Sequence, residues 1–490
     1  MLKKIKTLAG DTLIYGIFTI VSRFLTFLLT PLYSNYLTLD EVGDVTYIFS
    51  IIAFLNIIYN IGMETAFFRF YKKDDFIESQ KAFSNSYLVI ILFSLFLSFL
   101  IFFNSETIAH SLPLTTNAIE LIQISAFIPF FDSIAVIPYA LLRMVRKVKK
   151  FSSLRFLQVM TAVVLNVVFV VAFPWGSKGV MLAQIISNAI AVFIFIPELR
   201  KYLIFKIDKS LLKQMFRFGL PTIPASLSSI VLQIADRPIL IHLTNSVQGA
   251  IYSVNYRLGI PMMMFVGVFE YAWKPFYLSN YEEKDAKQLY SRIMTYFTLI
   301  CAVIFLLTGF FMEFLVRMPF VGGKFINPDY WEGMGIIPII LGGYFFNGIF
   351  NVLSAGFNIE KKTDYLPIAV GVAAVVNIGL NFLLIPIIGY WGAAYATFIA
   401  YFISAVLLYY FTKKVYFIKY ELKRLFLIIF LTLAIYYSFT FVTQGLELWL
   451  SFVLKTVALL LFVILLKIFG FFTSSEISGI KRLINFKNRK

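Results

Sequence analysis

Three arginines lie inside long apolar stretches of the sequence: Arg23, Arg237 and Arg257. An ionisable side chain is costly to bury in such a stretch, so each is a candidate functional residue. The guanidinium group stays protonated, and its planar fork makes bidentate, charge-assisted hydrogen bonds to carboxylates and phosphates. Arg23 lies about 17 Å into its stretch at 1.5 Å per residue, too deep for its side chain to reach water. We therefore expect Arg23 and Arg257 to contact an anionic ligand.

Arg237 lies only about 8 Å from the end of its stretch, so its side chain could instead reach out to water. Two carboxylates in apolar stretches, Asp132 and Asp236, could pair with the other arginines and serve only to fix packing. Either could also take up a proton or bind a coupling cation, because burial favours the neutral form of a carboxyl group. Asp236 and Arg237 are adjacent, and i,i+1 neighbours point in different directions on a helix. We therefore expect each of them to have a partner elsewhere.

Four further charged residues fall near the ends of apolar stretches, at equivalent places in two halves of the chain: Glu64, Arg69, Glu270 and Lys274. Pairs of opposite charge between the halves would form a gate on the cytoplasmic side that opens when a ligand enters. Ordinary solvated helix ends account for the same four residues equally well.

The composition shows which elements must hold these residues. Of 490 residues, 60% are hydrophobic and 14% are charged, whereas a soluble domain has about 25% charged residues. This composition indicates a polytopic membrane protein with an all-α fold. A helix that crosses the bilayer needs about 20 mostly apolar residues, which predicts about fourteen such helices. They lie at roughly 12–37, 42–64, 82–103, 117–142, 156–173, 179–197, 216–242, 247–270, 293–312, 333–357, 366–385, 391–411, 425–443 and 447–470.

The distribution of cations predicts the orientation of these helices. The net charge is +17, and most of the 43 Lys and Arg residues fall in connections that share one face. The positive-inside rule assigns this face, and both termini, to the cytoplasm. The net charge is then a topology signal and does not indicate nucleic-acid binding. Three basic connections alternate cations with apolar residues, as amphipathic helices on an anionic leaflet do, at 143–155, 198–217 and 412–424.

The sequence also contains an internal repeat. Residues 37–43 and 243–249 both begin Leu-Thr and end in Gly, and residues 165–183 and 380–396 share Leu-Asn followed by a small-residue helix start. Parallel halves occur in transporters that rock between inward-open and outward-open states. The repeat predicts an N-terminal six-helix lobe at 1–200, a C-terminal six-helix lobe at 201–411, and two added helices with a basic tail at 412–490.

Several of these motifs resemble one known superfamily. They are the run 377–386, the segment 389–397, the Phe-Gly-Leu-Pro of 218–221, and the adjacent Asp236 and Arg237. The chain resembles the multidrug/oligosaccharidyl-lipid/polysaccharide (MOP) exporter superfamily. With about fourteen spans it is most similar to the polysaccharide transporter and O-antigen flippase branch. The resemblance implies a MATE-like, V-shaped pair of lobes around a central cavity that opens alternately to each side.

The resemblance also implies a function and partners. The chain would flip a polyprenyl-diphosphate-linked oligosaccharide across the cytoplasmic (inner) membrane for O-antigen, capsule or lipopolysaccharide assembly, with Arg23 and Arg257 on the diphosphate. No cofactor is expected beyond proton or sodium coupling. The expected partners are the lipid-linked oligosaccharide, anionic membrane lipids, and the polysaccharide polymerase and glycosyltransferases of the pathway, with no nucleic acid.

Three alternatives remain open at this point. Within the superfamily they are a peptidoglycan lipid-precursor flippase and a drug/cation antiporter, and outside it a membrane glycan polymerase. The sequence favours a transporter over an enzyme, because it has no nucleotide-binding loop and its outer acidic residues are scattered. His110, His242 and Cys301 are isolated from one another, so the sequence indicates neither a metal site nor a disulfide.

Overall fold

The structure is a computed structural model that describes residue 18 and residues 20–115 and 117–471. These residues are almost wholly helical, with one short antiparallel hairpin of β1 (Pro319–Phe320) and β2 (Gly323–Lys324). The two termini, which the sequence predicts to be cytoplasmic, and the start of the first predicted span lie outside the described residues.

The first half of the described chain contains the helical segment 20–27, followed by eleven α-helices and one π-helix. They are α2 (Leu29–Tyr36), α3 (Leu39–Asn60), α4 (Met63–Phe70), α5 (Phe76–Phe103), α6 (Ser105–Ser111), α7 (Ala118–Ser125), α8 (Ile128–Met144), α9 (Val148–Asn166), η1 (Val167–Ala172), α10 (Gly176–Ile194), α11 (Ile196–Tyr202) and α12 (Lys209–Gly219).

The rest of the described chain repeats this pattern of long helices joined by short connections. Its elements are η2 (Leu220–Thr222), α13 (Ile223–Ile234), α14 (Asp236–Leu243), α15 (Ser246–Arg257), α16 (Ile260–Asn280), α17 (Ala286–Arg317), η3 (Pro328–Ile336), α18 (Ile337–Ile359), α19 (Tyr365–Ile388), α20 (Tyr390–Val415), α21 (Leu422–Val442) and α22 (Leu448–Ile468).

Twelve helical segments of the described residues are long and apolar enough to cross a membrane. This confirms the predicted all-α polytopic membrane protein. Two of the fourteen predicted spans are not among these twelve segments, each for a local reason. The span at 12–37 begins outside the described residues, and the span at 247–270 is interrupted between α15 and α16 at Leu258 and Gly259.

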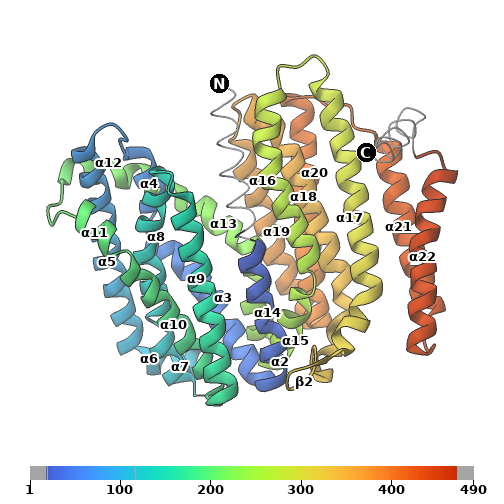
Figure 1. Cartoon of the computed structure of the whole chain (residues 1–490), viewed down its shortest axis with the longest axis horizontal. Helices are drawn as coiled ribbons and strands as arrows, with labels where there is room; N and C mark the ends of the chain where they lie inside the picture. The colour runs from blue at the N-terminus through green and yellow to red at the C-terminus, as the bar shows by residue number, and fades with distance from the viewer. Residues whose placement is uncertain (1–17, 19, 116, 472–490) are drawn as a thin grey trace, which may run out of the picture.

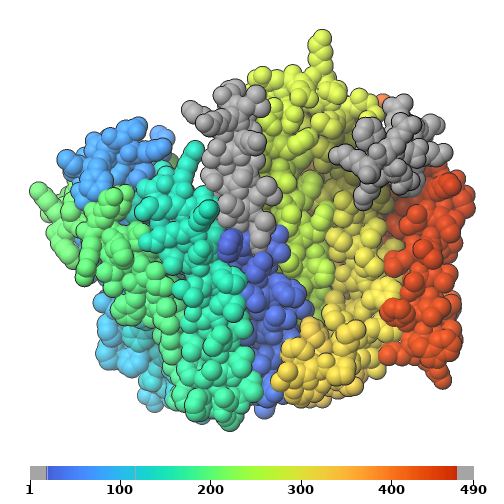
Figure 2. All heavy atoms as spheres, viewed as in Figure 1, coloured from blue at the N-terminus to red at the C-terminus, as the bar shows by residue number. Residues whose placement is uncertain are grey.

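The helices form two groups (Figure 1). Helices α3 to α12 lie on one side and α14 to α20 on the other, while α13 runs between the two groups. Helices α21 and α22 pack against the outside of α17. The surfaces of the two groups meet at the end that carries the β1–β2 hairpin (Figure 2). We call these groups the first and second lobes, and the hairpin end, which the predicted topology places outside the cell, the outer face.

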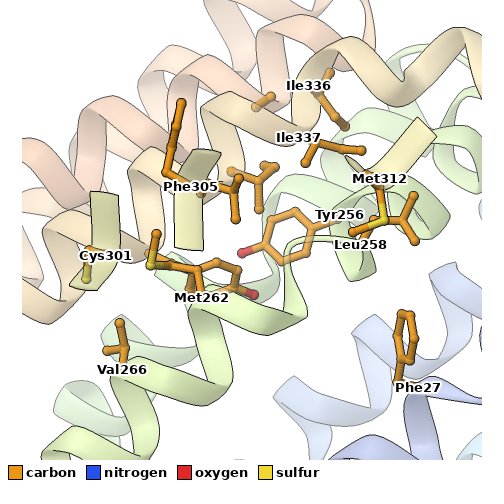
Figure 3. Packing of buried hydrophobic residues seen from close by; sticks show 14 of the residues in the cluster. Phe27, Tyr256, Leu258, Met262, Val266, Cys301, Phe305, Met312, Ile336 and Ile337 are labelled. Atoms are coloured by element: carbon orange, nitrogen blue, oxygen red, sulfur yellow. The ribbon is translucent and has the colours of Figure 1, made fainter. Parts of the chain in front are cut away.

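Apolar packing holds the second lobe together. Its main cluster joins α15, α16, α17 and the start of α18 through residues such as Leu258, Met262, Phe305 and Ile337 (Figure 3). The same cluster continues into the first lobe through Val45 and Ile48 of α3. Phe27 stands on a separate helix at the edge of this cluster, so the first span is part of the same core.

The connection between the lobes packs on the first lobe. Met215 of α12 is fully buried against Met63 and Phe67 of α4. Asn85 of α5 donates its side-chain N–H to the Asp208 carbonyl at 2.9 Å and accepts the Asp208 N–H at 3.0 Å. Residues up to Gly219 therefore follow the first lobe, although the repeat places them in the second half.

The two lobes begin corresponding helices with the same device. Thr38 and Glu41 form a capping box at the start of α3, and the Asn245 side chain accepts the Gln248 N–H at 2.9 Å at the start of α15. The structure thus pairs Thr38 with Asn245, one residue away from the register in which the sequence patterns were matched.

The capping residues also reach a distant helix start in the same way. Glu41 accepts the backbone N–H of Ser177 at 3.2 Å, and Gln248 accepts that of Tyr390 at 3.3 Å. The residue before each donating N–H has a positive φ, which glycine adopts at little cost. These residues are Gly176 (φ 57°) and Gly389 (φ 56°).

Lys455 of α22 is held by the core and does not extend to the membrane surface. It is 6% exposed, and its Nζ lies 3.5 Å from Glu313 of α17 and 5.3 Å from the ring centre of Phe314. We expect Glu313→Ala to lower the free energy of unfolding by about 1–3 kcal/mol, below the 3–5 kcal/mol of fully buried pairs because Glu313 is partly exposed. Thermal unfolding in detergent measures this change. Glu313→Gln combined with Lys455→Met should restore most of the stability, and no recovery would contradict the pairing.

Candidate functional site

A cavity of about 510 Å³ lies between the two lobes. Four arginines line it, and no Asp or Glu is found in its lining among the described residues. The arginines come from the helical segment 20–27, from α9, and from α14 and α15. The lining residues are Phe18, Ser22, Arg23, Thr26, Phe27, Phe151, Ser152, Arg155, Val159, Arg237, Tyr256, Arg257, Ile260, Met263 and Tyr344.

Arg23 extends from the first span into this cavity. Its side chain is exposed there, and a guanidinium nitrogen lies 3.1 Å from where a Cβ on Gly267 of α16 would be. Among the described residues no carboxylate lies within ion-pair distance of Arg23, although it acts electrostatically on Glu270. Arg23 therefore spans the gap between the lobes with its hydrogen-bonding groups available.

Arg257 is the last residue of α15, immediately before the break at Leu258 and Gly259. A helix C-terminus carries partial negative charge, which stabilises a cation at this position. Within the part of the chain that the structure describes, the Arg257 side chain makes no hydrogen bond or ion pair. Its nearest electrostatic neighbours are Tyr33 and Arg237. Arg257 is thus partly buried beside another cation, an arrangement that favours an anionic ligand.

The prediction that Asp236 and Arg237 have separate partners is wrong. Their side chains form an ion pair at 3.2 Å, and the backbone N–H of Arg237 also donates to Asp236 Oδ1 at 2.9 Å. The helix breaks at Ala235, because Pro238 lacks an N–H and its ring crowds the preceding turn. Asp236 is therefore the first residue of a new helix, where its side chain folds back toward its neighbour. The Arg237 guanidinium also donates to the freed carbonyl of Gln233 at 2.7 Å.

Asp236 is the centre of a buried network in the second lobe. It is 1% exposed, and its Oδ2 accepts hydrogen bonds from Tyr252 Oη at 2.5 Å and Thr397 Oγ1 at 3.1 Å. Asn377 extends the network to Thr397 at 3.4 Å, and Asn381 donates to Asn377. This network accounts for several polar residues of the motifs at 377–386 and 389–397.

A substitution that removes only one charge of this network is expected to lower the stability of the fold strongly. Asp236→Asn should destabilise the fold by about 3–5 kcal/mol, because it leaves the Arg237 guanidinium without its counter-ion. Asp236→Asn combined with Arg237→Gln should recover most of that loss in thermal unfolding. Recovery of stability without recovery of transport would assign Asp236 a role beyond packing, whereas equal unfolding midpoints for the single and double variants would contradict the pairing.

Asp132 lies in the first lobe and does not pair with an arginine. Its oxygens accept hydrogen bonds from the amides of Asn188 at 2.7 Å and Asn56 at 3.2 Å. No described cation lies within ion-pair distance, although Arg155 acts on it electrostatically. The alternative that Asp132 or Asp236 neutralises Arg23 or Arg257 is therefore not seen in this arrangement.

Arg155 lines the cavity but was not predicted from the sequence. Its guanidinium stacks on the Tyr139 ring at 3.9 Å and donates to Gln158 at 3.3 Å. The sequence assigned Arg155 to the basic connection 143–155, whereas α9 already begins at Val148. Arg155 and Gln158, three residues apart and followed by the apolar end of α9, were the signal that marked this face.

The four predicted gate residues do not pair between the lobes in this structure. Glu64 pairs with Arg143 of its own lobe at 3.3 Å, and Glu270 accepts from Asn351 at 3.2 Å. Lys274 acts electrostatically on Glu270, and Arg69 is exposed. No ion pair joins the lobes through these four residues in the described part of the chain, so the gate stays a prediction.

The lobes are closed at the outer face, through a residue that the sequence did not single out. Asp44 of α3 is fully buried and accepts hydrogen bonds from Ser246 Oγ of α15 at 2.8 Å and from Thr115 Oγ1 at 3.0 Å. A Cβ on the adjacent Gly43 would lie 2.2 Å from the Ser246 carbonyl oxygen. Asn35 also bonds to the Lys324 carbonyl of the hairpin at 2.8 Å. These contacts separate the cavity from the outer face.

Comparison with known proteins identifies a matching family and solved structures that are similar to this chain. The sequence profile of a family described as "Polysaccharide biosynthesis protein" matches residues 8–280. No curated protein matches the whole sequence significantly. The structure of the lipid II flippase MurJ in an inward closed conformation is similar, with a TM-score of 0.75 and 18% identity, over 93% of this chain and 99% of MurJ.

Two transporter structures share the fold at lower similarity. An inward-facing multidrug resistance MATE transporter of the MOP superfamily has a TM-score of 0.63 and 13% identity, over 80% of this chain and 94% of that protein. A MOP superfamily transporter from Pyrococcus furiosus has a TM-score of 0.59 and 12% identity, over 82% and 95%. These likenesses show that the chain shares the fold of MOP superfamily transporters, and the profile, which covers more than half of the sequence, shows that the chain belongs to the polysaccharide biosynthesis protein family.

Proposed function

We propose that the chain is a flippase that moves a polyprenyl-diphosphate-linked oligosaccharide from the inner to the outer leaflet of the cytoplasmic membrane. By this proposal it serves O-antigen, capsule or related lipopolysaccharide assembly. The observation that carries the proposal is the pair Arg23 and Arg257, which line one cavity from the first span and from the end of α15, with no described carboxylate within ion-pair distance. Two such forks suit the two phosphates of a diphosphodiester.

The geometry supports binding from the cytoplasmic side. The lobes are joined at the outer face through Asp44 and Ser246, so by this proposal a ligand enters the cavity from the opposite end, which the predicted topology places in the cytoplasm. A volume of about 510 Å³ lies within the range of ~300–1,000 Å³ for small-molecule sites. The phosphates and sugars would occupy this cavity while the isoprenoid tail stays in the bilayer. Movement of the lobes would then break the outer contacts and form the gate at Glu64, Arg69, Glu270 and Lys274.

Energy coupling and membrane contacts complete the proposal. Asp132 and Asp236 are the candidate carboxylates for proton or sodium coupling. The exposed face of α12 carries Lys209, Lys213 and Arg217 at four-residue spacing, which suits an anionic cytoplasmic leaflet. The polymerase and glycosyltransferases of the pathway are the proposed protein partners.

A lipid II flippase is the second candidate, because the structural similarity to MurJ covers 93% of this chain. Both candidates require a diphosphate site, so the arginines do not separate them. Lipid II differs from a polysaccharide precursor in the sugars and peptide it carries, which the cavity lining outside the arginines would have to recognise. A drug/cation antiporter is disfavoured, since the described part of the lining contains four arginines and no carboxylate.

Reconstitution into liposomes tests the proposal. Purified protein would be given fluorescent polyprenyl-diphosphate oligosaccharide, lipid II or a cationic dye, each with and without imposed proton and sodium gradients. We expect translocation of the oligosaccharide lipid at a rate at least about tenfold above protein-free vesicles, with little transport of the dye. Faster movement of lipid II than of the oligosaccharide lipid would support the second candidate, and movement of the dye alone would overturn both.

A further inference from the structure

Asp132 is a carboxylate in the membrane-spanning part of the first lobe without a cation in direct contact. Its two oxygens accept only from neutral amides, Asn188 Nδ2 at 2.7 Å and Asn56 Nδ2 at 3.2 Å. An ionised carboxylate is costly in a transmembrane bundle unless it is paired. A proton on Asp132 would remove this cost.

Asp132 is connected to the central cavity by a chain of side chains. Asn188 Oδ1 accepts from Gln158 Nε2 at 2.8 Å, and Gln158 Oε1 accepts from Arg155 Nη1 at 3.3 Å. Tyr139 fixes both ends of this step, because its hydroxyl donates to Gln158 at 3.2 Å and its ring lies under the Arg155 guanidinium. Arg155 in turn lines the cavity between the lobes.

Arg155 is the charged group that acts on Asp132 among the described residues. The other charged groups on helices packed against α8 are engaged elsewhere or lie at the helix ends. Glu64 of α4 pairs with Arg143, Glu78 of α5 with Lys81, and Lys178 of α10 with Glu120 of α7. The acidic residues of α3 lie in its first two turns. Asp40, for example, is about four helical turns from Asn56, the residue of α3 that contacts Asp132. A change in the charge of Asp132 would therefore alter the electrostatic potential of the cavity through Arg155.

We propose that Arg155 is a further anion-binding residue of the cavity and that proton occupancy of Asp132 controls its strength. When Asp132 is ionised, its negative charge attracts Arg155 and lowers the positive potential of the cavity. When Asp132 carries a proton, the Arg155 guanidinium is available to the anion. Because linkage is reciprocal, anion binding also favours proton uptake by Asp132. This inference rests on the proposed anion-binding function of the cavity.

The test measures binding of one defined probe as a function of pH. The probe is geranyl-diphospho-N-acetylglucosamine, whose diester phosphates stay ionised across the range, bound to the full-length protein in nanodiscs and followed by calorimetry. Wild-type affinity should be about tenfold higher at pH 5.5 than at pH 8, a typical coupling between two sites. Asp132→Asn should bind tightly at both pH values, and Arg155→Gln weakly at both. Glu120→Gln, which removes a carboxylate from the same lobe outside the chain of contacts, should keep the wild-type pH dependence.

The outcomes separate this inference from the proposed function. If Arg23→Ala and Arg257→Ala bind the probe as wild type does, the cavity is not the anion site and both proposals fail. If those variants lose binding but Asp132→Asn keeps the wild-type pH dependence, the coupling alone is overturned. The coupling to a proton would also be overturned if wild-type affinity changed with the Na⁺ concentration at constant pH and this change were absent in Asp132→Asn. Sodium, and not a proton, would then be the coupled ion. Elution of each variant as a single monodisperse species in gel filtration shows that folding does not explain the result.

Discussion

Substitution of Arg257 or Arg23 by alanine is expected to reduce translocation of the lipid-linked oligosaccharide at least about 100-fold. Each guanidinium can donate two charge-assisted hydrogen bonds to a phosphate, and such bonds contribute about 1.5–3 kcal/mol each. The loss of two is therefore worth at least a factor of about 100 in binding, since 1.4 kcal/mol is tenfold. Lysine at either position keeps the charge but loses the planar fork, so it should restore transport only in part.

The matched control is Arg200→Ala. Arg200 is exposed on α11, away from the cavity lining, so its loss should leave transport near the wild-type rate. Protein abundance in the membrane would be measured alongside surface polysaccharide in cells and translocation in liposomes. Wild-type surface polysaccharide in the Arg23→Ala strain, at normal protein levels, would remove Arg23 from the site.

The class of fold follows from simple features of the sequence. Apolar stretches of bilayer length and the one-sided distribution of cations can be recognised without tertiary information. They depend on the bilayer and the water around each helix and not on the helices that it packs against. The same reasoning finds arginines that break the pattern, and the structure places Arg23, Arg237 and Arg257 in one cavity. What hydropathy does not give is the depth at which a helix begins. Arg155 was assigned to a connection for this reason, although α9 starts two turns earlier at Val148.

Two other differences have local physical causes. The rule that adjacent residues point apart holds for a continuous helix, and it failed at Asp236 and Arg237 because Pro238 ends the helix between Gln233 and Asp236. Asp44 carried no signal, since one acidic residue near the start of a predicted span looks like an ordinary helix end. Its importance depends on contact with Ser246, about 200 residues away in sequence, and such long-range contacts leave no local pattern.

The gate residues illustrate a different limit. A transporter with alternating access has at least two arrangements of its lobes, and a pair that forms in one is absent in the other. This structure has the outer contacts made and the predicted inner pairs apart. The inner pairs therefore belong to an arrangement that a single structure does not contain, and the outer contacts offer the more direct test of the mechanism.

Gly43→Val is expected to abolish transport by preventing closure of the outer face. A Cβ at this position would lie 2.2 Å from the Ser246 carbonyl oxygen and 2.6 Å from its Cβ, so the lobes cannot approach as they do here. Overpacking of this kind costs about 1–3 kcal/mol or more, enough to shift a two-state equilibrium by about five- to 150-fold toward the outward-open arrangement. Because each arrangement must be visited once per cycle, a shift of this size in one direction slows the whole cycle.

The direction of that shift distinguishes a gate from a simple defect. A cysteine at Ser22, which lines the cavity, should react faster with a membrane-impermeant thiol reagent added outside cells that carry Gly43→Val, with the native Cys301 replaced by serine in every strain. Gly371→Val is the matched control, because a Cβ on this helical glycine would meet nothing within 4 Å. The control should keep both transport and slow labelling. Equal labelling of Ser22→Cys in the two glycine variants would show that the contact between α3 and α15 does not close the outer face, whereas faster labelling with lost transport would establish it as the outer gate.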